Sequence, residues 1–98
     1  MMNEKKTRVT PELKEFLKAR AQALKPVVMT GQHGLTPAVL NEINLALDHH
    51  ELVKVRLNAA EREDRKAMAE TIRADTAAEL IQAIGHVITL YRKNLSKG

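Results

Sequence analysis

A strand–helix–strand succession near the middle of the chain limits its possible folds more than any other feature. The run VVMT (27–30) is short, apolar and β-branched, which is typical of a buried strand. Thr36 and Pro37 then begin a helix that extends to about His49, and LVKVRL (52–57) alternates as a strand with one covered face. A helix between two strands of one sheet is typical of a right-handed crossover that joins parallel strands. The two strands are therefore predicted to be parallel.

An amphipathic helix is predicted before this unit, from Pro11 to about Leu24. Thr10 is its expected N-cap, and the helix ends ahead of Pro26 because the residue before a proline avoids the helical region. Residues at helical spacing form its predicted apolar face: Leu13, Phe16, Leu17, Ala21 and Leu24.

A third helix and two strands are predicted after LVKVRL. Residues 60–76 contain good helix formers and neither glycine nor proline. ELIQAIG (79–85) and HVITLYR (86–92) are predicted strands, paired antiparallel through a tight turn at Gly85-His86. The order α-β-α-β-α-β-β predicts an α/β fold, an α+β arrangement of two layers in which one sheet packs against helices.

Composition narrows the class of protein further. The chain has 98 residues, which is enough for one domain, and it has no cysteine, which excludes disulfides and thiolate metal sites. No apolar run is long enough to span a membrane, and no apolar segment follows the charged N-terminus as in a secretory signal. We therefore expect a cytoplasmic protein without a membrane partner.

Catalytic and metal chemistry have little support in the sequence. Ser96 is the only serine and lies in a polar tail, and no nucleophile–base pattern is present. His49 and His50 are adjacent on a helix, so their side chains point in different directions, and one of them is expected to cap the helix C-terminus. We expect no enzymatic activity, no cofactor and no metal.

The segment between the first predicted strand and the second helix contains two glycines, Gly31 and Gly34, around Gln32 and His33. A sharp strand-to-helix turn explains one glycine, because glycine reaches positive φ at no steric cost. Two glycines also leave a bare backbone, and GxxG loops of KH domains clamp nucleic-acid backbone in this way. The following helix N-terminus would favour an anion such as phosphate.

Positive charge gathers in the first third of the chain and at its end, within a net charge of +4. Such placement suits a polyanion, although a solubilising surface explains it equally well. The chain has two aromatic residues, Phe16 and Tyr91, too few for a platform on which bases stack. Contacts to phosphate are therefore predicted for the loop and for these cations: Lys14, Lys18, Lys25, Lys54, Arg56, Arg92 and Lys93.

The stretch LKPVVMTGQHGLTPAVLNEINLALDHHELVKVRL, followed later by IGHVITLYRK, resembles the CRM domain. This is the RNA-binding domain of chloroplast splicing factors and of small bacterial YhbY-type ribosome-assembly proteins. The resemblance covers roughly residues 10–93, so one domain is expected there, between flexible segments at 1–9 and 94–98. It implies a four-stranded mixed sheet, like that of the C-terminal domain of bacterial translation initiation factor three.

The resemblance also implies RNA binding through Gly31, Gln32, His33 and Gly34. A free-standing domain of this length resembles the bacterial members, which implies 23S rRNA or its precursor in the large ribosomal subunit as the partner. We expect the protein to be a monomer. The alternative is a small protein-interaction module whose basic surface meets an acidic protein. A nucleotide-binding enzyme ranks last, because the three-glycine fingerprint and its downstream acidic residue are missing.

Overall fold

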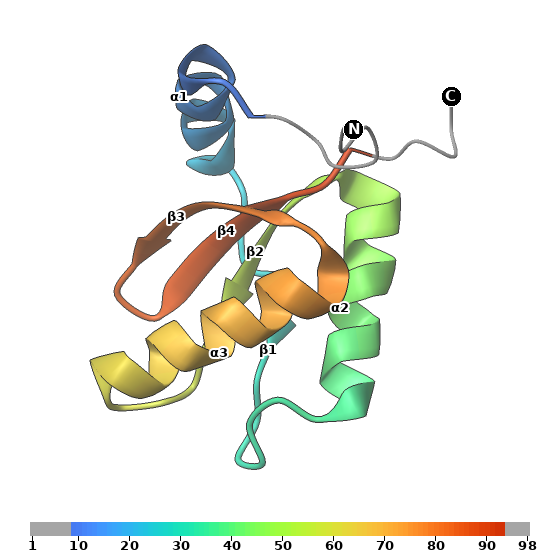
Figure 1. Cartoon of the computed structure of the whole chain (residues 1–98), viewed down its shortest axis with the longest axis vertical. Coiled ribbons are helices and arrows are strands. Elements are labelled where there is room, and N and C mark those ends of the chain that lie inside the picture. Colours follow the sequence, from blue (N-terminus) through green and yellow to red (C-terminus); the bar gives the residue numbers. More distant parts are fainter. Residues whose placement is uncertain (1–8, 94–98) are drawn as a thin grey trace, which may run out of the picture.

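The order of elements along the chain is the predicted one. The computed structural model describes residues 9–93 (Figure 1). Its elements are α1 (Pro11–Ala21), β1 (Val28–Met29), α2 (Pro37–His50), β2 (Leu52–Arg56), α3 (Arg62–Thr76), β3 (Glu79–Ile84) and β4 (Val87–Tyr91). The flexible segments were predicted at 1–9 and 94–98, and all of these residues except residue 9 lie outside the described part of the chain.

The four strands form one mixed sheet in the order β1-β2-β4-β3. β1 and β2 are parallel, with Val28 opposite Val55, which confirms the predicted crossover. β4 is antiparallel to both β2 and β3, and the turn at Gly85-His86 joins β3 to β4 with Gly85 at φ 58°. The last strand of the described chain therefore lies inside the sheet, between two strands that precede it.

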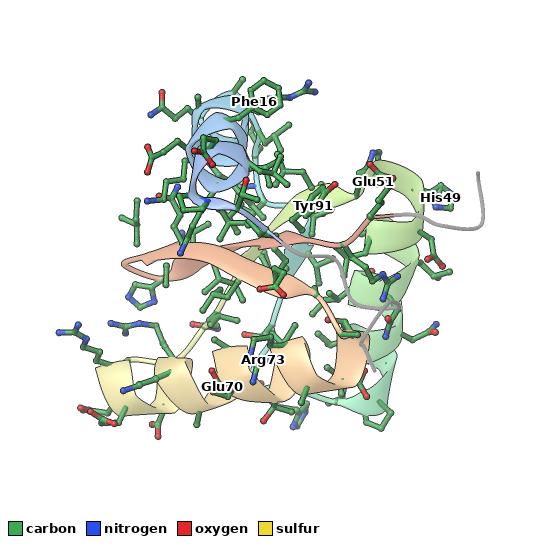
Figure 2. The ribbon with its side chains drawn as sticks, turned by 45° about the horizontal axis from the view of Figure 1, so that its top comes forward. Phe16, His49, Glu51, Glu70, Arg73 and Tyr91 are labelled. Atoms are coloured by element: carbon green, nitrogen blue, oxygen red, sulfur yellow. The ribbon has the colours of Figure 1, made fainter. Side chains whose placement is uncertain are left out.

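Helices cover both sides of this sheet. α2 and α3 lie on one side and α1 on the other (Figures 1 and 2). The alternation of LVKVRL is confirmed, because Val53, Val55 and Leu57 are buried toward α2 and α3. Ile43, Leu47, Ile72, Ile88 and Leu90 complete the centre of that core.

The opposite side of the sheet is only partly covered. Leu17 and Ala21 of α1 are buried there, and so is Ile81 of β3, all outside the main core cluster. α1 therefore adds a partial third layer to the two layers predicted from sequence. In residues 9–93, no helix has the length and apolar character needed to cross a membrane.

The first helix differs from its prediction in length and in the face it buries. It ends at Ala21 rather than Leu24, because the amide groups of Ala23 and Leu24 bond back three residues in tight turns that lead toward β1. Phe16 is 56% exposed, so its predicted place in the core is wrong. Leu17 and Ala21 lie one turn apart and face the sheet, which leaves Phe16 about 100° around the helix from Leu17.

The first strand is also less buried than predicted. The apolar run VVMT predicts a buried strand, but only Val28 and Thr30 are buried. Val27 and Met29 are exposed, because β1 is an edge strand whose second face is not covered by α1. This uncovered face lies beside the two predicted glycines.

Candidate functional site

The two glycines close a tight turn that projects from the molecule between β1 and α2 (Figure 1). The amide of Gly34 donates to the carbonyl of Gly31 at 3.1 Å, and Gly34 has φ 71°. Gln32 and His33 at the tip are exposed. A Cβ atom added to Gly31 would meet no heavy atom within 4 Å, so the main chain of this turn is open to a bulky partner.

The start of α2 offers fewer free N–H groups than its sequence predicts. Pro37 has no N–H, and the Thr36 hydroxyl accepts the amide of Val39 at 3.2 Å. The Thr36 carbonyl accepts the amide of Leu40. The amide of Ala38 and the helix dipole are what this end presents to an anion, and no acidic residue lies in the first turn.

Three of the predicted cations form a series that starts beside this turn. Arg56 is exposed and lies opposite Met29, and its carbonyl accepts the amide of Thr30, the residue before Gly31. The ammonium group of Lys54 donates to the Leu24 carbonyl at 3.2 Å, which brings β2 next to the segment between α1 and β1. Because that segment continues with exposed Lys25, we call Lys25, Lys54 and Arg56 the basic row.

Two other predicted cations are far from the turn. Lys14 and Lys18 belong to α1, which lies at the opposite end of the molecule from the 31–34 turn (Figure 1). The longest dimension of the fold is 37 Å. Lys18 also lies 3.5 Å from a carboxylate oxygen of Glu15. These two lysines are therefore separated from the basic row on the surface.

The Arg92 guanidinium makes hydrogen bonds within the fold and is not free on the surface. Its Nη1 donates at 2.8 Å to both the Asn44 side chain and the Thr76 carbonyl. Its Nη2 donates to the Asn44 carbonyl at 3.1 Å and to Asp48 at 2.8 Å. These bonds fasten the end of β4 to α2 and to the end of α3, and exposed Lys93 follows directly.

Tyr91 lies at the end of β4, near Glu51 (Figure 2). Its side chain is half-buried, as expected for a core or rim residue. Burial raises the pKa of the Tyr91 phenol, and the negative charge of Glu51 raises this pKa further. Both effects favour the neutral form of the phenol.

His49 and His50 lie in the last turn of α2. Nδ1 of His49 donates to the Leu45 carbonyl at 3.0 Å, which confirms that one histidine caps the last turn of α2. The His49 and His50 rings are tilted, with centroids 6.2 Å apart. Residues 9–93 contain no cluster of three or more potential metal ligands among His, Cys, Asp and Glu.

Some polar groups at or near the surface were not predicted from the sequence. Arg20 lies 5.8 Å from the centre of the exposed Phe16 ring, a cation–π contact that helical spacing of four residues would have indicated. Gln82 and Thr89 line a hollow on the uncovered sheet face. A larger cavity, about 710 Å³, lies between α3 and the β3–β4 hairpin, with Arg62, Arg65 and Lys66 in its lining beside Glu63 and Glu70.

The sequence of this chain is similar to a known domain family and to known proteins. A model of the CRS1 / YhbY (CRM) domain matches residues 9–92. An "RNA-binding protein" of Haemophilus influenzae is 46% identical over 86 residues, which cover 88% of this chain and 87% of the relative. "Probable RNA-binding protein PA4753" of Pseudomonas aeruginosa is 43% identical over 86 residues, with 88% and 83% covered.

A solved structure has the same architecture. The solution structure of the hypothetical protein SAV1595 from Staphylococcus aureus superposes with a TM-score of 0.77 and 31% sequence identity. The match covers 88% of this chain and 90% of that one. The predicted α/β order and the four-stranded mixed sheet are therefore confirmed.

Proposed function

This chain belongs to the CRS1 / YhbY (CRM) domain family, and from that premise we propose that it is a non-enzymatic RNA-binding protein. Relatives that match most of its length carry the name RNA-binding protein. Residues 10–93 form the proposed binding unit. Its proposed contact surface is the 31–34 turn together with the basic row.

One observation carries this proposal: an open main-chain turn stands at the end of a series of cations. A Cβ atom at Gly31 would meet no heavy atom within 4 Å, and Arg56 lies on the neighbouring strand, bonded to Thr30. Exposed backbone amides and cationic side chains together bind phosphate oxygens. Since the chain has only two aromatic residues, phosphate contacts supply most of the affinity.

The remaining predicted cations have other parts in this proposal. Lys14 and Lys18 provide a second, distant contact with a long RNA, through α1. Arg92 acts indirectly, because its guanidinium holds β4 against α2. Lys93 extends the cationic surface at that end of the sheet.

We propose that the RNA is 23S rRNA or its precursor, and that the protein acts in the cytoplasm as a monomeric ribosome-assembly factor. The match of residues 9–92 to the CRM domain family supports this role. Its mechanism is to hold a structured segment of the rRNA through backbone contacts until folding or processing proceeds.

A salt titration of RNA binding tests the proposal. We expect the affinity for 23S rRNA fragments to fall linearly on a log–log plot, by about 0.7 per phosphate contacted in single-stranded RNA. Arg56→Gln should lower the steepness by about one such contact. The matched control is Arg62→Gln, which makes the same charge change at an exposed position of α3, on the other side of the sheet.

Two results would contradict RNA binding at this surface. A salt slope near zero, or equal competition by an acidic peptide, indicates the alternative, a protein-interaction module with a basic surface. Equal slopes for the two arginine variants would remove the basic row from the interface.

A further inference from the structure

A hollow of about 250 Å³ lies on the sheet face that α1 leaves uncovered. We call it the sheet hollow, and its lining consists of Pro26, Lys54, Gln82, Ile84, Val87 and Thr89. Three neighbouring strands supply its floor, because Thr89 of β4 lies between Lys54 of β2 and Gln82 of β3. It adjoins the basic row, since Lys54 belongs to both.

The Thr89 hydroxyl gives this hollow a polar floor. Thr89 is 1% exposed, yet its hydroxyl has no hydrogen-bond partner among the described residues. The hydroxyls of the other buried threonines are satisfied, Thr30 by the Asn58 amide and Thr76 by the Ile72 carbonyl. Every fully buried side-chain oxygen or nitrogen in residues 9–93 has a hydrogen-bond partner. The Thr89 hydroxyl, which has none, is therefore not fully buried, and Thr89 lines the hollow.

A second polar group lies beside this hydroxyl. Gln82 is opposite Thr89 in the sheet and half-buried, and its side-chain amide has no partner in the described part of the chain. An amide and a hydroxyl each offer a donor and an acceptor. Two such groups on one floor favour a ligand that presents donors and acceptors along an edge.

Exposed apolar side chains lie on the same face of the sheet. Ile84 is 67% exposed and Met29 is 65% exposed, and Val27 is exposed as well. Met29 lies on the same face as Arg56, its register partner, so an apolar and a cationic side chain lie next to each other on neighbouring strands. The surface thus combines a polar floor, exposed apolar side chains and cations. A flat apolar ring with a hydrogen-bonding edge, attached to an anion, matches all three.

An RNA base outside a double helix has this chemistry. Proteins hold such bases against aromatic or apolar side chains and hydrogen-bond to their edges. A paired base is stacked within the duplex and does not enter a hollow on a protein surface. The volume is below the roughly 300–1,000 Å³ typical of sites for drug-sized ligands, which suits one base rather than several.

We propose that the sheet hollow receives one unpaired nucleobase of the RNA whose phosphates follow the basic row to the 31–34 turn. The ring lies on Ile84 and Val87, its edge meets Gln82 and Thr89, and its phosphate lies near the Lys54 ammonium group. This inference rests on the proposed function and specifies the kind of RNA that the same surface binds.

The test compares a short single-stranded RNA, which carries one fluorescent adenine analogue, with the same strand annealed to its complement. Wild-type protein should bind the single strand more tightly and change the fluorescence of the analogue. Thr89→Val removes one hydrogen-bonding group at constant shape and should lower single-strand affinity about five-fold, with duplex affinity unchanged. Gln82→Leu should act in the same direction.

Thr71→Val is the matched control, because its exposed hydroxyl on α3 bonds the Ala67 carbonyl away from the hollow. Thr89→Val breaks no internal hydrogen bond and keeps a β-branched strand residue, so it should fold as the wild type does. Thermal unfolding of each variant verifies this before binding is compared.

The outcomes separate the two proposals. If wild-type protein binds the duplex as tightly as the single strand, or if Thr89→Val and Gln82→Leu keep wild-type affinity, the base site is overturned while RNA binding stands. If wild-type protein binds neither RNA, the proposed function itself fails. Competition by an acidic peptide alone would assign the hollow to a protein partner.

Discussion

Nη2 of Arg92 lies 2.8 Å from a carboxylate oxygen of Asp48, which joins the end of β4 to the last turns of α2. The same guanidinium donates to the carbonyls of Asn44 and Thr76. One side chain thus satisfies acceptors at the end of α3 and on α2 at once. The attachment of this end of the sheet, opposite the 31–34 turn, to α2 and α3 depends on Arg92.

Replacing Arg92 by methionine should lower the free energy of unfolding by about 2–3 kcal/mol, because main-chain acceptors lose a charged donor. The melting temperature should fall by roughly 4–8 °C for each kcal/mol in a domain of this size. Thermal and urea unfolding measure both quantities. Arg73→Met, which breaks an exposed pair with Glu70, is the control and should change stability little. Equal effects of the two variants would deny Arg92 its structural role.

Gly31→Asp should weaken RNA binding sharply without unfolding the protein. Its side chain enters open space, and Gly31 lacks the positive φ of Gly34, so only charge repulsion and crowding of the RNA remain. Gly31→Ala separates crowding from charge. Gly34→Ala should instead cost about 1 kcal/mol of stability, because alanine is strained at φ 71°. Anisotropy and thermal unfolding measure the two effects, and unchanged affinity in folded Gly31→Asp would remove the turn from the site.

Tyr91 should titrate above its ordinary pKa of about 10 in the folded protein. Burial is the first cause and the charge of Glu51 the second, and both disfavour the phenolate. The stability from the neutral phenol is therefore complete below the unfolded pKa and is lost as the pH rises through the folded pKa. As the only tyrosine in a chain without tryptophan, Tyr91 can be followed by phenolate absorbance.

Comparison of the wild type with Tyr91→Phe isolates this alkaline loss from that of the lysines. Glu51→Gln should move the absorbance midpoint back part of the way toward its ordinary value. A midpoint at or below the ordinary value would show that the phenol is solvated.

Phe16→Ala should lower stability by less than about 1 kcal/mol, because the ring is largely exposed. Leu17→Ala should cost about 2–5 kcal/mol, since its side chain is buried between α1 and the sheet. Urea unfolding of both variants compares adjacent residues on one helix. The reverse order would restore Phe16 to the core, as helical spacing alone predicts.

Local patterns in the sequence predicted the elements well because they reflect local physics. Thr10 and Thr36 act as the expected N-caps, with hydroxyls 3.1 and 3.2 Å from the amides they accept. The alternation of LVKVRL correctly separated the buried and uncovered faces of β2. Phe16 was misplaced because the buried stripe of α1 depends on where this helix lies on the sheet, a tertiary property.

The candidate site was less predictable than the fold. Proximity in sequence does not fix proximity in space, so Lys14 and Lys18 lie far from the turn that the sequence grouped with them (Figure 1). Arg92 looks like a surface cation in sequence, but its contacts are with residues far earlier in the chain. Thr89 could not be predicted as a site residue, because only the pairing of three strands places it in the sheet hollow.

The central position of β4 also bears on how the protein reaches its fold. A ribosome makes the chain from its amino end, so β2 and β3 leave the exit tunnel before the strand that lies between them. Until Val87–Tyr91 emerges, both strands have unpaired edges that are open to wrong partners. The sheet of the nascent protein is therefore completed only after Val87–Tyr91 emerges, and a chain cut short at Gly85 has no strand to join β2 to β3.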